Sequence, residues 1–176
     1  MTHPSNIVRS TFYLSAATSS AVYLICISSM MMAELQNGIY MIERDQQGLL
    51  STNGVELYSP AVLHPLGFSD HQKWEVINKP NGTVHFKVPG KSLYLSNLGD
   101  DKAVQFGQPV RLEETESSWQ LLSAEDNDAF MIQTPMNHFS PPLVLDIGQA
   151  SIFPAPLNLM PLSGPQQSWI FRRVVE

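Results

Sequence analysis

The sequence predicts an all-β fold in which twelve short strands form three pseudo-repeats of four strands each. The first observation is that the three tryptophans, Trp74, Trp119 and Trp169, each stand two residues before an apolar residue, as on a strand with one buried face. The second is that a leucine lies 24 residues before each tryptophan. The third is that no stretch outside the N-terminal segment keeps the apolar period of a helix, about 3.6 residues.

Each repeat opens at a turn-prone residue pair, which a strand of alternating apolar residues follows. The three pairs are Asn37-Gly38, Asn81-Gly82 and Asn127-Asp128. In the first repeat the apolar residues are Tyr40 and Ile42, two positions apart as one strand face requires. The second strand contains the leucine of the tryptophan spacing and the residue after it: Leu50-Ser51, Leu95-Ser96 and Leu145-Asp146.

The third strand of each repeat is expected at a proline, and the fourth strand carries the tryptophan. The prolines are Pro60, Pro109 and Pro156, and proline suits the first residue of a strand. The three repeats then span about 37–80, 81–126 and 127–174. Twelve strands in three such units match a barrel capped by hairpins, the β-trefoil, in which closure removes the sheet edges. A β-sandwich with accidental tryptophan spacing is the alternative.

Chain length and N-terminal composition set the expected domain boundaries. A chain of 176 residues suits one domain, which we expect at 34–176. Residues 1–33 form a separate apolar segment, and its apolar run at 21–27 is too short to span a membrane, which takes about 20 residues. We expect a flexible tail, or an extension ahead of a natural start at Met32, with a weak signal peptide as the alternative.

Composition argues against several partners and cofactors. A formal charge of -6 with scattered basic residues disfavours nucleic acid, which takes clustered Lys and Arg. The five histidines lack metal-like spacing, and no cofactor-binding motif is present. The single cysteine, Cys26, lies in the N-terminal segment, so a disulfide within 34–176 is excluded. This fits the cytoplasm, with secretion as the alternative if residues 1–33 act as a signal peptide.

Two of the three tryptophans end a Gln-x-Trp motif. The motif occurs as Gln72-Lys73-Trp74 and Gln167-Ser168-Trp169, whereas the second repeat departs with Ser117-Ser118-Trp119. Over residues 37–174 this pattern resembles the ricin-B-type lectin family, of the fungal cysteine-free kind. The motif predicts the fold more directly than sugar binding, because its tryptophan fills the core and its glutamine can satisfy backbone groups of a turn.

The resemblance implies a carbohydrate-binding protein with at most one well-formed sugar site, in the third repeat. Sugar recognition needs a carboxylate, an amide and a flat apolar surface. The positions that match the family's site are Asp146, Asn158, Met160, Gln166 and Gln167. Repeats one and two have Ser51 and Ser96 in place of the aspartate. An Asp146 that accepts backbone N–H groups of a turn is the alternative.

The stacking aromatic of such a site is missing from the third repeat. Met160 occupies its position, and Phe153 or His138 on neighbouring loops could substitute for it. In the first repeat His64 lies near the matching position, and with His71 it could form part of a degenerate second site.

The same architecture also resembles the small cysteine-free trefoil protease inhibitors of fungi. Such inhibitors act through loops on a rigid barrel, and the candidate loops here are 59–69, 97–108 and 134–142. No sequence motif of a hydrolase or a metalloenzyme is present, so we expect no enzyme. The expected partners are glycans or glycoproteins, or alternatively a protease. A lectin with one weak site would gain avidity as a homodimer.

Overall fold

The computed structural model describes residues 35–68, 71–97, 104–124, 128–135 and 141–175. The expectations for residues 1–33 therefore lie outside the described residues. Within the described ranges, no helix is both long enough and apolar enough to cross a membrane.

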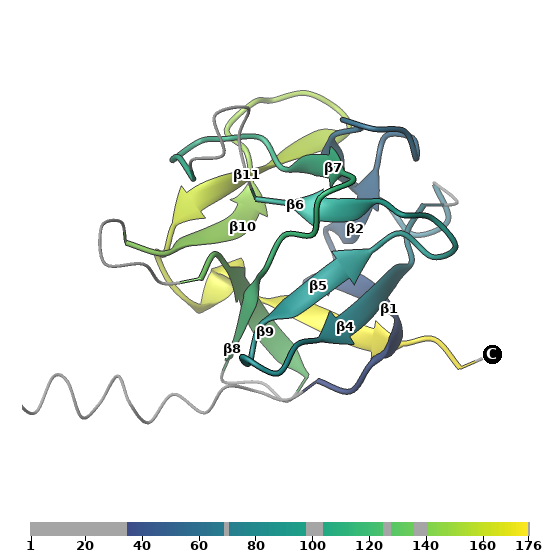
Figure 1. Ribbon diagram of the computed structural model, residues 1–176. Helices are drawn as coiled ribbons and strands as arrows, with labels where there is room; N and C mark the ends of the chain where they lie inside the picture. The colour runs from purple at the N-terminus through teal and green to yellow at the C-terminus, as the bar shows by residue number, and fades with distance from the viewer. Residues whose placement is uncertain (1–34, 69–70, 98–103, 125–127, 136–140, 176) are drawn as a thin grey trace, which may run out of the picture. The chain divides into compact units, whose positions relative to one another are not determined.

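The described chain contains four strands in each of three pseudo-repeats (Figure 1), so the predicted β-trefoil is confirmed. The first repeat has β1 (Gly38–Arg44), β2 (Gly48–Thr52), β3 (Ala61–His64) and β4 (Trp74–Asn78). The second has β5 (Val84–Lys87), β6 (Tyr94–Ser96), β7 (Arg111–Glu113) and β8 (Gln120–Ser123). The third has β9 (Ala129–Gln133), β10 (Leu143–Ile147), β11 (Ala155–Pro161) and β12 (Trp169–Arg173), with a 3-10 turn, η1 (Pro165–Gln167), before the last strand.

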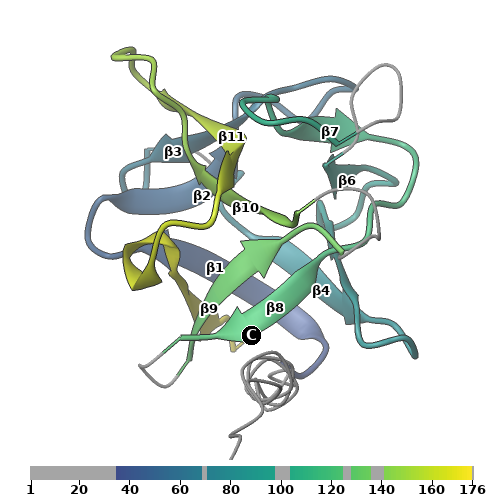
Figure 2. The same ribbon diagram turned by 90° about the vertical axis from the view of Figure 1, so that its left-hand side faces the viewer.

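The first and fourth strands of each repeat form a closed ring. β1 pairs with β4, β4 with β5, β8 with β9, β9 with β12 and β12 with β1. A bridge between Val84 and Trp119 completes the ring between β5 and the start of β8. The remaining strands pair as β2–β3, β6–β7 and β10–β11 and cap one end of the barrel, the upper end in Figure 1, while Figure 2 shows the same elements from the side.

The three tryptophans occupy equivalent places in a shared core. Their side chains are 0–1% exposed. Each indole Nε1 donates a hydrogen bond to the leucine carbonyl 24 residues earlier: Trp74 to Leu50 (2.9 Å), Trp119 to Leu95 (2.9 Å) and Trp169 to Leu145 (3.0 Å). A buried indole N–H needs an acceptor. The sequence spacing is therefore the signature of a hydrogen bond that occurs once per repeat.

The three prolines lie where neighbouring cap hairpins meet. Pro60 bridges to Arg111, Pro109 bridges to Asn158, and Pro156 pairs with Val62. Each contact joins one repeat to another, and together they form a ring. The expectation that proline opens a strand holds only approximately: β3 begins one residue after Pro60, β7 two residues after Pro109, and β11 one residue before Pro156.

Candidate functional site

Asp146 lies near the end of β10, where the strand changes from buried to partly exposed residues. Its neighbour Leu145 is fully buried in the core, and Asp146 points the other way, with its side chain 17% exposed. Across the ladder it lies opposite Asn158 of β11. The strand thus holds the carboxylate at the surface of the cap, beside a second strand that also carries predicted site residues.

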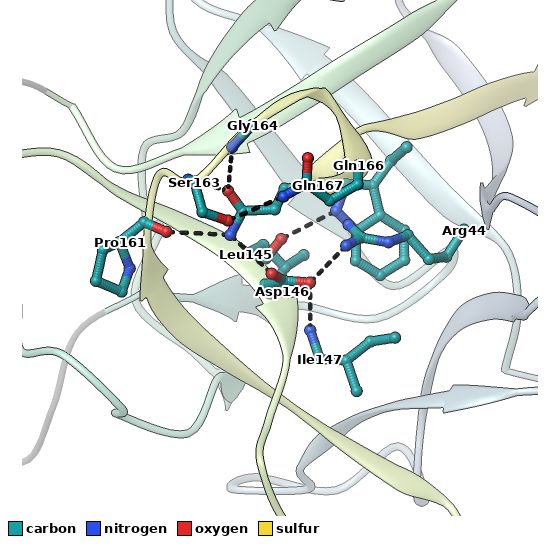
Figure 3. Close-up of polar contacts among 10 residues, drawn as sticks. Arg44, Leu145, Asp146, Ile147, Pro161, Ser163, Gly164, Gln166 and Gln167 are labelled. Carbon is teal, nitrogen blue, oxygen red and sulfur yellow. Dashed lines mark hydrogen bonds and ion pairs between the residues drawn. The ribbon is translucent and has the colours of Figure 1, made fainter.

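The carboxylate of Asp146 is held by three donors (Figure 3). Oδ1 accepts from Nη2 of Arg44 at 2.6 Å and from the backbone N–H of Ile147 at 2.7 Å. Oδ2 accepts from Nε2 of Gln167 at 2.7 Å. An ionised carboxylate has about four acceptor positions. Three of them are occupied, so one position on Oδ2 can accept a hydrogen bond from a ligand.

Arg44 reaches Asp146 from the end of β1, 102 residues earlier in the chain. Its side chain is 6% exposed, and its guanidinium carbon lies 5.2 Å from the ring centre of Trp169. Burial lowers the pKa of Arg44, and the attraction of Asp146 opposes that shift. The ion pair therefore joins the first repeat to the third through a contact that is largely out of water.

The sequence reasoning missed Arg44, although a signal for it exists. Tyr40, Ile42 and Arg44 alternate along β1, and all three are at most 5% exposed. A strand face that continues its apolar alternation into an arginine predicts a buried cation, which needs a partner carboxylate. The sequence did not say which carboxylate would come from the other end of the chain.

Gln167 fixes both the carboxylate and the loop beside it. Its Nε2 donates to Asp146 and to the carbonyl of Pro161 (3.0 Å), while its Oε1 accepts from the N–H groups of Ser163 (2.5 Å) and Gly164 (3.4 Å). The residue is 2% exposed. It therefore acts as a positioning residue and offers no surface to a ligand.

The other three predicted site residues lie on the same side of the cap. Gln166 is exposed, and its amide donates to Ser163 Oγ at 3.2 Å. Met160 is half-buried on the same face of β11 as Asn158, whose Nδ2 donates to the carbonyl of Gly107 at 3.0 Å. Oδ1 of Asn158 is buried and has no hydrogen-bond partner within the described part of the chain.

Phe153, the expected substitute for a stacking aromatic, packs against residues of the first repeat. Its ring centre lies 5.3 Å from that of Phe68 and 6.0 Å from that of His64. The pairing of β11 with β3 brings these loops together. Phe153 and Phe68 are 66% and 61% exposed, so they form an exposed aromatic pair over a buried histidine. His138, the other expected substitute, lies outside the described residues.

The positions that match Asp146 in the first and second repeats are buried and inaccessible to a ligand. Ser51 is fully buried and donates to the carbonyl of Leu49 at 3.0 Å. Ser96 is 1% exposed and lies 3.0 Å from the hydroxyl of Ser117, which stands where the other repeats have glutamine. Among these three equivalent positions, only the third repeat presents a polar side chain to solvent.

Within the described residues, no group of three or more His, Cys, Asp or Glu side chains is placed to hold a metal ion. The groups around Asp146 can accept hydrogen bonds from a neutral polar ligand and donate hydrogen bonds to it, with Met160 as an apolar surface beside them.

Comparison with known proteins places the chain among β-trefoils. No protein-family profile and no curated protein matches the sequence. Among solved structures, the Macrolepiota procera ricin B-like lectin in complex with lactose matches with a TM-score of 0.63 and 19% identity, over 81% of this chain and 100% of that one. The Rhizoctonia solani agglutinin matches with a TM-score of 0.65 and 16% identity, over 81% and 99%.

A designed protein with threefold symmetry, ThreeFoil, gives a TM-score of 0.65 at 14% identity, over 78% of this chain and 100% of that one. At identities this low the likeness establishes the fold. The chain is a β-trefoil that resembles fungal ricin B-like lectins in structure, as the sequence motif suggested.

Proposed function

We propose that the protein binds carbohydrate through one site in the third repeat, centred on Asp146. The observation that carries the proposal is the partly exposed carboxylate of Asp146, fixed by Arg44 and Gln167 with one acceptor position left on Oδ2. A rigidly held acceptor loses little entropy when a sugar hydroxyl docks on it.

The surrounding groups supply the other requirements of a sugar site in modest form. Gln166 is an exposed amide that can both donate and accept, and Met160 offers an apolar surface without an aromatic ring. Because Arg44 and Asp146 neutralise each other, the site suits a neutral saccharide better than an anionic one. The structural likeness to a lectin solved with lactose supports the same class of ligand.

Calorimetric titration of the full chain with lactose, after a glycan array has ranked other sugars, tests this proposal. Asp146→Asn should weaken binding about tenfold or more, because it removes a charged acceptor worth about 1.5–3 kcal/mol. Glu56→Gln, at an exposed carboxylate on another loop, serves as the matched control and should leave affinity unchanged. Equal affinities for Asp146→Asn and the wild-type protein would contradict the site.

A gain-of-function variant separates the sugar role of the site from its structural role. Met160→Trp places an aromatic ring at the half-buried position that lacks one. The ring would supply the flat apolar surface against which the C–H face of a sugar can pack. We expect the variant to bind the same sugar more tightly, and a loss of binding with an intact fold would argue against Met160 as part of the surface.

Loop-based protease inhibition remains the second candidate, and one feature of the first repeat favours it. Gln72 is 5% exposed; it accepts from the N–H of Gly67 at 2.9 Å and donates to the carbonyl of Pro65 at 2.7 Å. The loop it holds presents Leu66 and Phe68, which are 75% and 61% exposed. A fixed loop with large apolar side chains suits a protease that cleaves after such residues.

Inhibition assays with chymotrypsin, subtilisin, trypsin and papain test the second candidate. Inhibition of the first two that is lost in Phe68→Ala or Leu66→Ala would support it. No inhibition at micromolar concentration of the full chain would exclude protease inhibition for these enzymes.

We also propose a cytoplasmic location, because a domain without cysteine suits a reducing compartment. We further propose a homodimer, in which two weak sugar sites would act together and which ultracentrifugation would detect.

A further inference from the structure

A pocket of about 380 Å³ lies where β1, β2 and β12 meet the segment that follows β3. It contains none of the residues of the Asp146 site. Its apolar lining includes Met41, Leu49 and Leu66, and its polar lining includes Glu43 and Arg172. A cavity of this size with a few convergent polar groups is typical of small-molecule sites.

Strand register explains why these side chains converge. Met41 and Glu43 are on the outer face of β1, because the alternate residues Ile42 and Arg44 are buried. Met41 lies opposite Arg172 of β12, and Glu43 lies opposite Leu49 of β2. Cross-strand neighbours on one face contact each other. The loop after β3 then closes the side of the pocket next to Leu49.

The polar side of the pocket is a neutral ion pair. Nε of Arg172 lies 2.5 Å from Oε2 of Glu43, and the two side chains are 58% and 22% exposed. The pair leaves the second carboxylate oxygen of Glu43 and the terminal nitrogens of Arg172 for a ligand. Because the pair carries no net charge, it favours a neutral ligand that offers both a donor and an acceptor.

The turn at the end of the pocket is held in a strained backbone conformation. Asp45 and Gln46 both have positive φ, 25° and 59°, in a turn closed by a hydrogen bond from Gln47 N–H to the carbonyl of Arg44 (2.7 Å). Such turns favour Asn-Gly or Asp-Gly. The glycine position of such a turn is taken here by Gln46, because Gly48 lies two residues further along, at the start of β2. Gln46 keeps an exposed amide side chain at the pocket despite the strain.

We propose that this pocket binds the acetamido group of an N-acetylated sugar. Leu49 at the floor and Leu66 at the exposed rim would contact the methyl group, and the carboxylate of Glu43 would accept the amide N–H. The acetamido carbonyl would accept from Arg172 or from the amide of Gln46. A plain hexose offers hydroxyl groups where this floor is apolar, and no aromatic ring lines the pocket for its C–H face.

The choice of a sugar as ligand rests on the proposed function, but the site is separate from Asp146. The pocket would therefore select N-acetylated sugars among those that the protein binds. It would also give each chain two points of contact with a branched or extended glycan.

The test is a calorimetric titration of the full chain with N-acetylglucosamine and N-acetylgalactosamine, and with glucose and galactose for comparison. We expect Glu43→Gln to weaken binding of the N-acetylated sugars about tenfold or more and to leave galactose binding unchanged. Leu66→Ser should also weaken binding of the N-acetylated sugars. The matched control is Val175→Ser, at a valine that is 89% exposed. Leu66 is 75% exposed, so its replacement should leave the fold intact.

Gln46→Gly is a variant that we expect to keep the fold intact. Glycine relieves the positive φ, so Tm should rise by about 2–4 °C, while affinity for the N-acetylated sugars falls. Loss of affinity in a variant of higher Tm assigns the amide to ligand binding. Unchanged affinity in both Gln46→Gly and Glu43→Gln would overturn the proposal.

The outcomes for the two sites can be told apart. If Asp146→Asn abolishes all sugar binding and the pocket variants have no effect, the pocket proposal fails and the proposed function stands. If the pocket variants abolish binding of N-acetylated sugars and Asp146→Asn does not, the pocket stands and the third-repeat site fails. If no sugar binds to the folded wild-type chain, both proposals fail.

Discussion

At the scale of single residues, the buried contact between Arg44 and Asp146 is the most consequential. The guanidinium is almost out of water, so its positive charge needs the carboxylate of Asp146 to compensate it. Arg44→Met should destabilise the fold by about 2–4 kcal/mol, less than a fully buried pair would lose, because Asp146 keeps 17% exposure. Urea denaturation followed by tryptophan fluorescence would measure this.

The double variant Arg44→Met with Asp146→Leu tests whether the stability lost in Arg44→Met comes from the charge left unpaired on Asp146. Replacing both partners by apolar side chains is often neutral for stability. We therefore expect the double variant to recover most of the stability that Arg44→Met loses, and to bind sugar weakly because it lacks the Asp146 carboxylate. A double variant less stable than Arg44→Met would show that the ion pair itself stabilises the fold.

Two buried histidines predict a loss of stability in mild acid. Burial lowers the pKa of His64, and burial with the nearby Lys79 lowers that of His85, against the attraction of Glu116. In the unfolded chain these histidines have their ordinary pKa of 6.5, so below about that pH the unfolded chain binds protons more readily than the folded one. The free energy of unfolding should therefore have its full value above pH 7 and fall as the pH is lowered toward 5.

Urea titrations at pH 7 and pH 5 would measure this loss. His64→Phe should reduce it, because phenylalanine fits the ring cluster with Phe68 and Phe153 and cannot bind a proton. A pH dependence that is equally steep in His64→Phe would assign the effect to other groups.

The sequence predicted part of the site at this scale. Asp146 and Gln167 were expected in one site, and the structure places them in hydrogen-bond contact. The use of Asp146 as a sugar ligand stays a prediction, whereas the burial of Gln167 leaves it a positioning residue. Arg44 could not be paired from the sequence, because the partner of a buried charge depends on which strands meet in the barrel. Phe153 could not be placed for the same reason, since its neighbours come from another repeat.

At the scale of elements, the glutamine and the tryptophan of the Gln-x-Trp motif have separate structural roles. The tryptophan ties its strand to the core, and the glutamine ties the preceding loop through backbone groups in the first and third repeats. Gln72→Ala leaves the carbonyl of Pro65 and the N–H of Gly67 without their partner. We expect a loss of about 1–3 kcal/mol, measured by thermal or urea denaturation.

Gln166→Ala is the matched control for that loss, because Gln166 is exposed and bonds only to a serine hydroxyl in the described chain. Its effect on stability should stay within about 0.5 kcal/mol. Equal losses for the two variants would mean that the buried glutamine contributes nothing specific to the loop.

The strands themselves were the most predictable elements. Apolar alternation and tryptophan spacing located the barrel strands, because burial in a shared core imposes both. The cap strands were placed less accurately, since the prolines make contacts between repeats that a local pattern does not encode. The strain at Asp45 and Gln46 was also invisible in the sequence, because those residue types do not announce a turn with two positive φ values.

At the scale of the whole molecule, the fold is closed by its two ends. β12 pairs with β1 from Tyr40 opposite Arg173 to Glu43 opposite Ile170. A chain that lacks β12 would lose Trp169 and expose the edges of β1 and β9. We expect truncation after Gln167 to unfold the entire domain, as measured by circular dichroism, because the three repeats share one core.

The shared core also predicts that unfolding is a single event. Trp74→Phe, Trp119→Phe and Trp169→Phe each remove one buried hydrogen bond and some core volume. Each should lower the same transition by about 1–3 kcal/mol. Separate transitions in calorimetry, one per repeat, would contradict a common core.

Because β1 pairs with β12, the barrel should form whichever of the three repeats comes first in the chain. The N–H of Val174 donates to the carbonyl of Ile39 at 2.9 Å, so the two ends of the strand ring are neighbours. A short linker could join them, and the exposed turn at Asn81 and Gly82 could be opened instead. We expect such a circular permutant to fold into the same barrel, with the third repeat in the middle of the chain and its sugar site unchanged.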